Sequence, residues 1–99
     1  MPELSEATVA KRVGVVISGD VQGVGFRWYC REQAERQGVG GYVRNLPDGR
    51  VEAVFEGNDM AVDAMVAWCR RGPQWARVES VQVEAEPVSG EGEGFRIGR

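Results

Sequence analysis

Residues 13–38 read VGVVISGDVQGVGFRWYCREQAERQG, and this stretch divides into three parts. Apolar side chains alternate over Val13–Ser18, and a period of two residues predicts a strand. After a glycine-rich segment, Phe26, Cys30, Ala34 and Gln37 follow one another at intervals of three or four residues, a spacing that predicts a helix. Gly38 follows, and glycine commonly ends a helix. The stretch therefore predicts a strand, a loop over Gly19–Gly25, and a helix.

Two further strands are predicted around a hairpin turn. Gly41–Asn45 forms the first. The second is Arg50–Glu56, in which one face carries Val51, Ala53 and Phe55 and the other carries Glu52, Val54 and Glu56. Leu46-Pro47-Asp48-Gly49 lies between them and has turn chemistry, with Gly49 suited to a positive φ. The two strands are therefore expected to pair with each other.

A second helix and two more strands follow. Asn58 or Asp59 is the expected N-cap of the helix, and Gly72-Pro73 is expected to end it. A strand is predicted over about Val78–Pro87, with one irregularity in its alternation. A short last strand is predicted over Phe95–Ile97.

The element order βαββαβ plus a short terminal strand is the split-βαβ, ferredoxin-like pattern. This is an α+β fold, with an antiparallel sheet and two helices on one face. Sixteen valines against two leucines agree with a substantial sheet. A chain of 99 residues makes one domain. We expect a disordered N-terminal extension over residues 1–10 and a single domain over residues 11–99.

Composition argues against several classes of function. Twelve Lys and Arg against fifteen Asp and Glu give a net charge of −3, which disfavours nucleic-acid binding. The sequence has no apolar run long enough to predict a membrane span, and its N-terminus lacks the pattern of a secretion signal. A cytoplasmic location is therefore expected. Histidine is absent, which excludes Ser–His, Cys–His and His–metal chemistry within one chain. Cys30 and Cys69 have no CxxC partner, so zinc is not expected either.

The glycine-rich loop and the following helix start form a candidate phosphate site. Glycines let consecutive backbone N–H groups turn toward one anion, and the first-turn N–H groups of a helix have no intrahelical partner. A cation at this helix end is mildly unfavourable unless an anion is bound, and Arg27 can then contact that anion bidentately. Alternatively, Arg27 extends into solvent or pairs with Glu32 or Asp20. The predicted phosphate-binding residues are Gln22, Gly23, Val24, Gly25, Phe26 and Arg27.

Asn45 is the second candidate, at the end of the second predicted strand. A carboxamide accepts and donates hydrogen bonds at once, so it can hold a water without ionising. Alternatively, Asn45 begins the turn by bonding its own backbone. The split-βαβ topology can bring the loop before the first helix near this strand, and the functional interpretation requires that proximity.

Other phosphate motifs fit less well. Gly23-Val24-Gly25 begins a GxGxxG pattern, but Trp28 occupies the third glycine position, and no GxxxxGK[ST] occurs. Cys30 and Arg36 match the Cys-x5-Arg spacing of cysteine phosphatases, yet the residues between them are helical and lack glycine. Cys30 should keep an ordinary thiol pKa there. We do not expect it to act as a nucleophile.

Ser18–Arg27 closely resembles the signature of the acylphosphatase family. Further resemblance comes from Gly38–Asn45 with Pro47–Glu52, and from a tail made of Gly72-Pro73, Ala76–Val78 and Phe95–Ile97. The resemblance covers about Val13 to Ile97. One departure is Asp20, where the family usually has a basic or neutral residue.

The resemblance implies hydrolysis of small acyl phosphates to a carboxylate and inorganic phosphate, with no metal or cofactor. Phosphate would act as product and inhibitor, and the chain is expected to be a monomer. The family's phosphate-binding arginine matches Arg27 and its water-orienting asparagine matches Asn45, so these two are the predicted catalytic residues. Because a carboxylate leaves without protonation, a phosphate-binding loop, one arginine and one asparagine that holds a water are sufficient for this hydrolysis.

Three alternatives stay open from sequence. An RNA-recognition module shares the βαββαβ layout, but it would show an aromatic motif and a basic surface. A ligand-sensing domain would bind phosphate without turnover. The front end of a hydrogenase-maturation carbamoyltransferase also resembles this chain, but that protein is far longer and carries zinc-binding cysteines.

Overall fold

The computed structural model describes residues 10–90 and 94–98 and contains the expected elements in the expected order. They are β1 (Ala10–Asp20), α2 (Phe26–Gln37), β2 (Gly40–Asn45), β3 (Val51–Asn58), α3 (Asp59–Arg71), β4 (Arg77–Glu86) and β5 (Phe95–Ile97). The proposed N-terminal extension falls on residues 1–9, which lie outside the described residues, and on Ala10, which begins β1.

The strands form one sheet in the order β4-β1-β3-β2-β5. The pairs β1–β4, β1–β3 and β2–β3 are antiparallel, as expected, but β5 pairs with β2 in parallel. The expectation of a wholly antiparallel sheet is therefore wrong at this edge. Phe95 lies opposite Gly41 and Ile97 opposite Val43, so β5 runs in the direction of β2.

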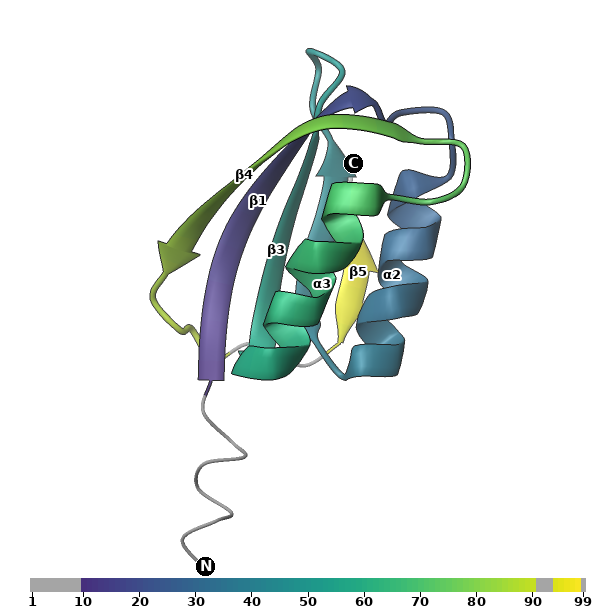
Figure 1. The fold of residues 1–99 in the computed structure, drawn as a ribbon. Helices are drawn as coiled ribbons and strands as arrows, with labels where there is room; N and C mark the ends of the chain where they lie inside the picture. Colours follow the sequence, from purple (N-terminus) through teal and green to yellow (C-terminus); the bar gives the residue numbers. More distant parts are fainter. Residues whose placement is uncertain (1–9, 91–93, 99) are drawn as a thin grey trace, which may run out of the picture.

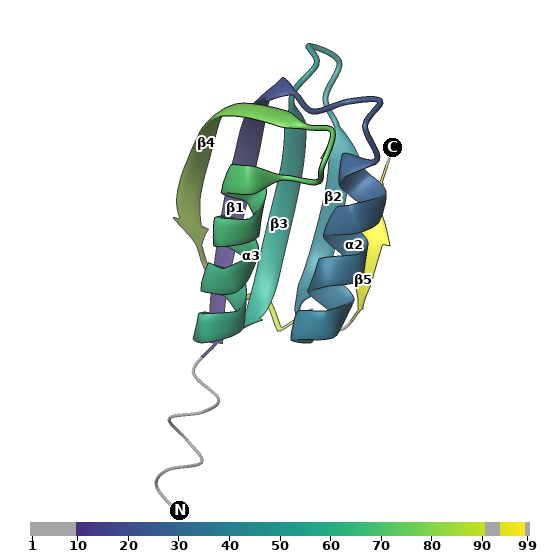
Figure 2. The ribbon, with the colours of Figure 1, turned by 45° about the vertical axis from the view of Figure 1, so that its right-hand side comes forward.

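Both helices cover the same face of the sheet (Figure 2), as predicted. The core lies between the two layers. Its buried helical side chains are Phe26, Cys30, Ala34, Val62, Met65 and Cys69. The facing strand residues include Val13, Val15, Ile17, Val43, Val51, Ala53 and Phe55. Gln37, which has the helical spacing of this stripe, is exposed because α2 ends there.

Local chemistry explains the boundaries of the hairpin and of α3. In the turn, Leu46 N donates to Arg50 O at 2.8 Å, and Asp48 accepts a hydrogen bond from Arg50 N. Gly49 has a φ of 98°, as its predicted turn position requires. Asn58 caps α3 by accepting hydrogen bonds from the backbone N–H groups of Met60 and Ala61.

The irregularity predicted in the fourth strand lies at its start. Ser18 is opposite Ser80 but Gly19 is opposite Val78, so Glu79 is an extra residue on β4. A Cβ on Gly19, whose φ is 127°, would stand 2.1 Å from the carbonyl oxygen of Arg77. Glycine at this position therefore permits the close approach of β4 just before the loop.

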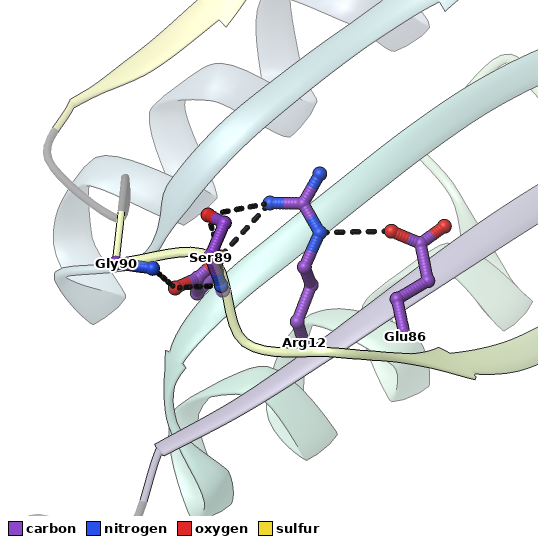
Figure 3. Close-up of polar contacts among 5 residues, drawn as sticks. Arg12, Glu86, Ser89 and Gly90 are labelled. Carbon is purple, nitrogen blue, oxygen red and sulfur yellow. Dashed lines mark hydrogen bonds and ion pairs between the residues drawn. The ribbon is translucent and has the colours of Figure 1, made fainter.

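A charged network ties the sheet together on the face away from the helices (Figure 3). Arg12 on β1 lies in register between Glu56 on β3 and Glu86 on β4, and it donates to both carboxylates at 2.8 Å. Glu56 is 3% exposed and also accepts hydrogen bonds from the backbone N–H groups of Ser89 and Gly90. The hydrogen bond from Arg12 is the largest cause that lowers the pKa of Glu56 to about 2. The network thus holds Ser89 and Gly90, which follow β4, against Glu56 on β3.

Candidate active site

The loop between β1 and α2 lies at the end of the sheet where the β2–β3 turn also lies (Figure 1). Gln22 joins the two: its side-chain Nε2 donates to the carbonyl oxygens of Leu46 and Arg50, each at 2.9 Å. Gln22 was expected among the phosphate-binding residues, but its side-chain N–H groups are used to hold the loop against the hairpin. These bonds place the loop beside Asn45.

Two left-handed glycines shape the loop. Gly23 has a φ of 78° and Gly25 a φ of 81°, a region that other residues rarely adopt. Gly25 is the N-cap of α2, and neither a side-chain cap nor an acidic residue in the first turn neutralises this helix end. The first-turn N–H groups and the positive end of the helix dipole therefore remain available to an anion.

A cleft of about 200 Å³ opens at this helix end. Its lining combines loop glycines, Gly23 and Gly25, with the polar residues Arg27 and Asn45. Its apolar lining residues are Val21, Phe26, Trp28 and Ile97. Arg27 and Asn45, from α2 and β2, are thus brought into one cleft, whereas Gln22 and Val24 do not line it.

Arg27 and Asn45 are half-buried, and neither side chain engages in a hydrogen bond or ion pair within residues 10–90 and 94–98. The alternative pairing of Arg27 with Glu32 is not found: the nearest cation recorded for Glu32 is Arg36, at 3.9 Å. Nor does Asn45 begin the turn through its side chain, since that turn is closed by backbone bonds and by Asp48.

Two residues singled out from the sequence, Asp20 and Cys30, lie outside this lining. Asp20 is exposed at the end of β1 and does not line the cleft. Cys30 is fully buried, and desolvation, reinforced by Cys69, raises the pKa of its thiol well above its usual value rather than leaving it ordinary.

Among the described residues, no cluster of histidine, cysteine or acidic side chains could hold a metal ion. The helices in the same part of the chain are too short or too polar to cross a bilayer.

Trp28 and Ile97 were not predicted to belong to the site. Ile97 reaches the cleft because β5 pairs with β2, which places Ile97 opposite Val43, two residues before Asn45. A strand of only three residues carries no sequence pattern that indicates which strand it will pair with. For Trp28, its position next to Arg27 on the helix was the one available indication.

Comparison with known proteins decides the family. The acylphosphatase family model matches residues 13–97. The chain belongs to the acylphosphatase family. An acylphosphatase of Rubrobacter xylanophilus is 61% identical over 94 residues, covering 95% of this chain and 86% of that protein.

Solved acylphosphatases share the fold. The Coxiella burnetii structure superposes with a TM-score of 0.83 at 35% identity, covering 89% of this chain and 92% of that one. The Bacillus subtilis structure gives 0.86 at 29% identity, covering 90% and 99%. As an acylphosphatase, the protein is a hydrolase of acyl phosphates, which are small molecules. This membership decides against the RNA-recognition interpretation.

Proposed function

We propose that this acylphosphatase binds the phosphate of its substrate with the loop glycines and Arg27, and that Asn45 holds the attacking water. One observation carries the proposal: an uncapped helix end, an unpaired guanidinium and an unpaired carboxamide line the same cleft in the described chain. The helix end and Arg27 are neighbours in sequence, whereas Asn45 reaches the same cleft from β2.

Phosphate binding follows from the charges at the helix end. A guanidinium beside a positive helix terminus is unfavourable on its own, and a bound dianion reverses the sign of both interactions. Arg27 then donates two parallel hydrogen bonds to phosphate oxygens, while backbone N–H groups near Gly25 contact the others. The same contacts would bind inorganic phosphate as a competitive product inhibitor.

The chemical step needs positioning more than proton transfer. The water oxygen bonds to phosphorus as the bond between phosphorus and the acyl oxygen breaks, and the electron pair leaves on the carboxylate. A carboxylate is stable without a proton, so no general acid is required. The water proton passes to a phosphate oxygen of the substrate. Asn45 orients the water by accepting a hydrogen bond from it through the carboxamide oxygen, a role that needs no ionisation.

We also propose that the enzyme acts without a metal, as a monomer, and in the cytoplasm. The location is supported by Cys30 and Cys69, which are buried free thiols, as expected in a reducing compartment.

Hydrolysis of benzoyl phosphate in ¹⁸O-labelled water, with EDTA present, tests the proposal. We expect phosphate release at an unchanged rate in EDTA, with the label in phosphate. Label in benzoate would mean attack at the carbonyl carbon and would exclude a water held for attack on phosphorus. Loss of activity in EDTA would show that a metal takes part.

A further inference from the structure

One side chain from outside the cleft joins the two sides of the proposed site. Gln22 directly precedes Gly23, which lines the cleft on the side of the loop. Leu46 directly follows Asn45, which lines the cleft on the side of β2. The Nε2 atom of Gln22 donates to Leu46 O and to Arg50 O, each at 2.9 Å. The phosphate loop and the Asn45 carboxamide are therefore each one residue away from the same pair of hydrogen bonds.

The partners of Gln22 allow its amide only one orientation. Both are carbonyl oxygens, which accept hydrogen bonds and donate none, so the amide nitrogen must face them. Each oxygen also accepts a backbone bond within the turn: Arg50 O from Leu46 N at 2.8 Å, and Leu46 O from Gly49 N at 3.2 Å. Gln22 is thus attached to the residues that close the turn, and its side chain has no N–H group left for a phosphate.

The loop depends on this contact for its position. In the described part of the chain, no other hydrogen bond joins Val21–Gly25 to Leu46–Arg50. Gly23 and Gly25 have positive φ values, and glycine has more backbone freedom than any other residue. Without the bonds from Gln22, the loop would be free to move relative to β2. A misplacement of about 1 Å between reacting groups can lower a rate by about 100-fold.

We propose that Gln22 is a positioning residue that sets the separation between the bound phosphate and the water held by Asn45. It touches neither, because it does not line the cleft. The proposal rests on the proposed function, since it places the phosphate at the loop and the water at Asn45. Loss of the Gln22 bonds should lower kcat and leave phosphate affinity nearly unchanged, because the loop glycines and Arg27 move together.

Gln22→Met tests this split, because methionine is similar in length and has no N–H donor. We expect kcat for benzoyl phosphate to fall by about tenfold, and the Ki of inorganic phosphate to change by less than about twofold. Gln82→Met is the matched control, since Gln82 is exposed on β4 and does not line the cleft. It should keep both values. Circular dichroism melts establish that each variant is folded. An unchanged kcat in folded Gln22→Met, or an equal loss of phosphate affinity, would overturn the proposal.

A double-mutant cycle with Asn45→Ala separates alignment of the water from general damage to the loop. If Gln22 acts by aligning that water, the double variant should lose no more kcat than the roughly 100-fold expected for Asn45→Ala alone. Losses that multiply to about 1000-fold would show that Gln22 acts independently of Asn45, and would overturn the proposal. An unchanged kcat in Asn45→Ala would instead refute the proposed function, a result that no Gln22 variant can produce.

A pH series on Gln22→Glu gives a readout that a purely structural role would not move. The neutral acid can donate one hydrogen bond to the turn, whereas the carboxylate donates none and is repelled by Leu46 O and Arg50 O. These oxygens stabilise the neutral form and so raise the pKa of the introduced carboxyl. The charged side chains of the turn, Asp48 and Arg50, are paired with each other at 2.8 Å.

The kcat of Gln22→Glu, divided by that of the wild type at the same pH, should therefore rise by about fivefold from pH 8 to pH 5. The corresponding ratios for Gln22→Met and for the control Gln82→Glu should stay constant. Because Gln22→Glu keeps one donor at low pH, it also provides the test if Gln22→Met does not fold. A constant ratio for Gln22→Glu would overturn the role assigned to these hydrogen bonds.

Discussion

Two half-buried arginines at opposite ends of the sheet differ in one respect. Arg12 sits between Glu56 and Glu86, and both carboxylates accept hydrogen bonds from its guanidinium. Arg27 sits at an uncapped helix end with no recorded partner among the described residues. Arg12 thus completes a structural network, whereas Arg27 leaves a charge available to a ligand. This difference in partners, more than any difference in burial, supports a structural role for Arg12 and the proposed ligand-binding role for Arg27.

Replacing Arg27 tests the difference most strongly. Arg27→Gln should lower kcat/KM for benzoyl phosphate by about 100- to 1000-fold, because one charged donor to the reacting group is lost. The free energy of unfolding should change by less than about 0.5 kcal/mol, since a helix N-terminus does not gain from a cation. Phosphate-release assays and urea unfolding measure the two quantities. Retention of more than about a tenth of the wild-type kcat/KM would refute the assigned role.

Asn45→Ala should act on turnover alone. We expect kcat to fall by about 100-fold, because the attacking water is no longer oriented. Inhibition by inorganic phosphate should change by less than about twofold, because the loop and Arg27 remain. Steady-state kinetics with added phosphate separate the two effects. Parallel loss of phosphate affinity would make Asn45 a binding residue instead.

The Arg12 network should affect stability and leave activity intact. Glu56→Gln should lower the free energy of unfolding by about 2 kcal/mol at neutral pH, since hydrogen bonds to a charged group are lost. The pKa of Glu56 is lowered to about 2 from its usual 4.5, so its stabilising effect is present above 4.5 and is lost as the pH falls toward 2. Urea unfolding at several pH values should show the free energies of unfolding of the wild type and of Glu56→Gln converging as the pH falls from 4.5 toward 2.

Arg12→Gln serves as the matched partner of Arg27→Gln. It should lose stability by a similar amount and keep kcat/KM within about twofold at neutral pH. A large loss of activity in a folded Arg12 variant would break the comparison between the two ends.

A smaller effect is expected from Asp20, which is exposed and outside the cleft. Asp20→Asn removes a screened negative charge near the phosphate loop and should lower KM by about twofold at low ionic strength. The gain should shrink as salt is added. An unchanged KM at low salt would show that this carboxylate does not influence the site.

The smallest effect is expected from Cys30. Cys30→Ser should remain active, and kcat should be nearly flat between about pH 6 and 8, because the proposed mechanism passes no proton through a side chain. Burial raises the pKa of the Cys30 thiol, so little thiolate exists in that range. A pH series on both proteins provides the measurement. A rate that rises tenfold per pH unit and disappears in the serine variant would indicate a thiol mechanism.

Local signals predicted much of this molecule. Turn chemistry at Asp48 and Gly49, the cap at Asn58 and the irregular fourth strand are each encoded by a few neighbouring residues, and the structure confirms them. Contacts between distant segments were not predictable in the same way. The parallel direction of β5 depends on its pairing with β2, and the three residues of β5 cannot specify that partner.

The site divides in the same manner. The glycine loop and Arg27 form a contiguous motif, and the topology allowed Asn45 to approach it. The bonds from Gln22 to the hairpin, and the arrival of Ile97 in the cleft, are long-range consequences of the fold. Sequence spacing carries no information about such contacts, because they depend on which strands become neighbours.

The edge position of β5 has a consequence for protein synthesis. The loop, Arg27 and Asn45 belong to segments that leave the ribosome early, but Ile97 belongs to the last strand of the sheet. A growing chain that has reached only β4 can pair β1, β3 and β2, yet one side of its cleft is still missing. Since chains fold from the N-terminus as they are made, the cleft is completed only after β5 has joined the sheet. A nascent chain therefore lacks one side of this cleft until β5 has been synthesised.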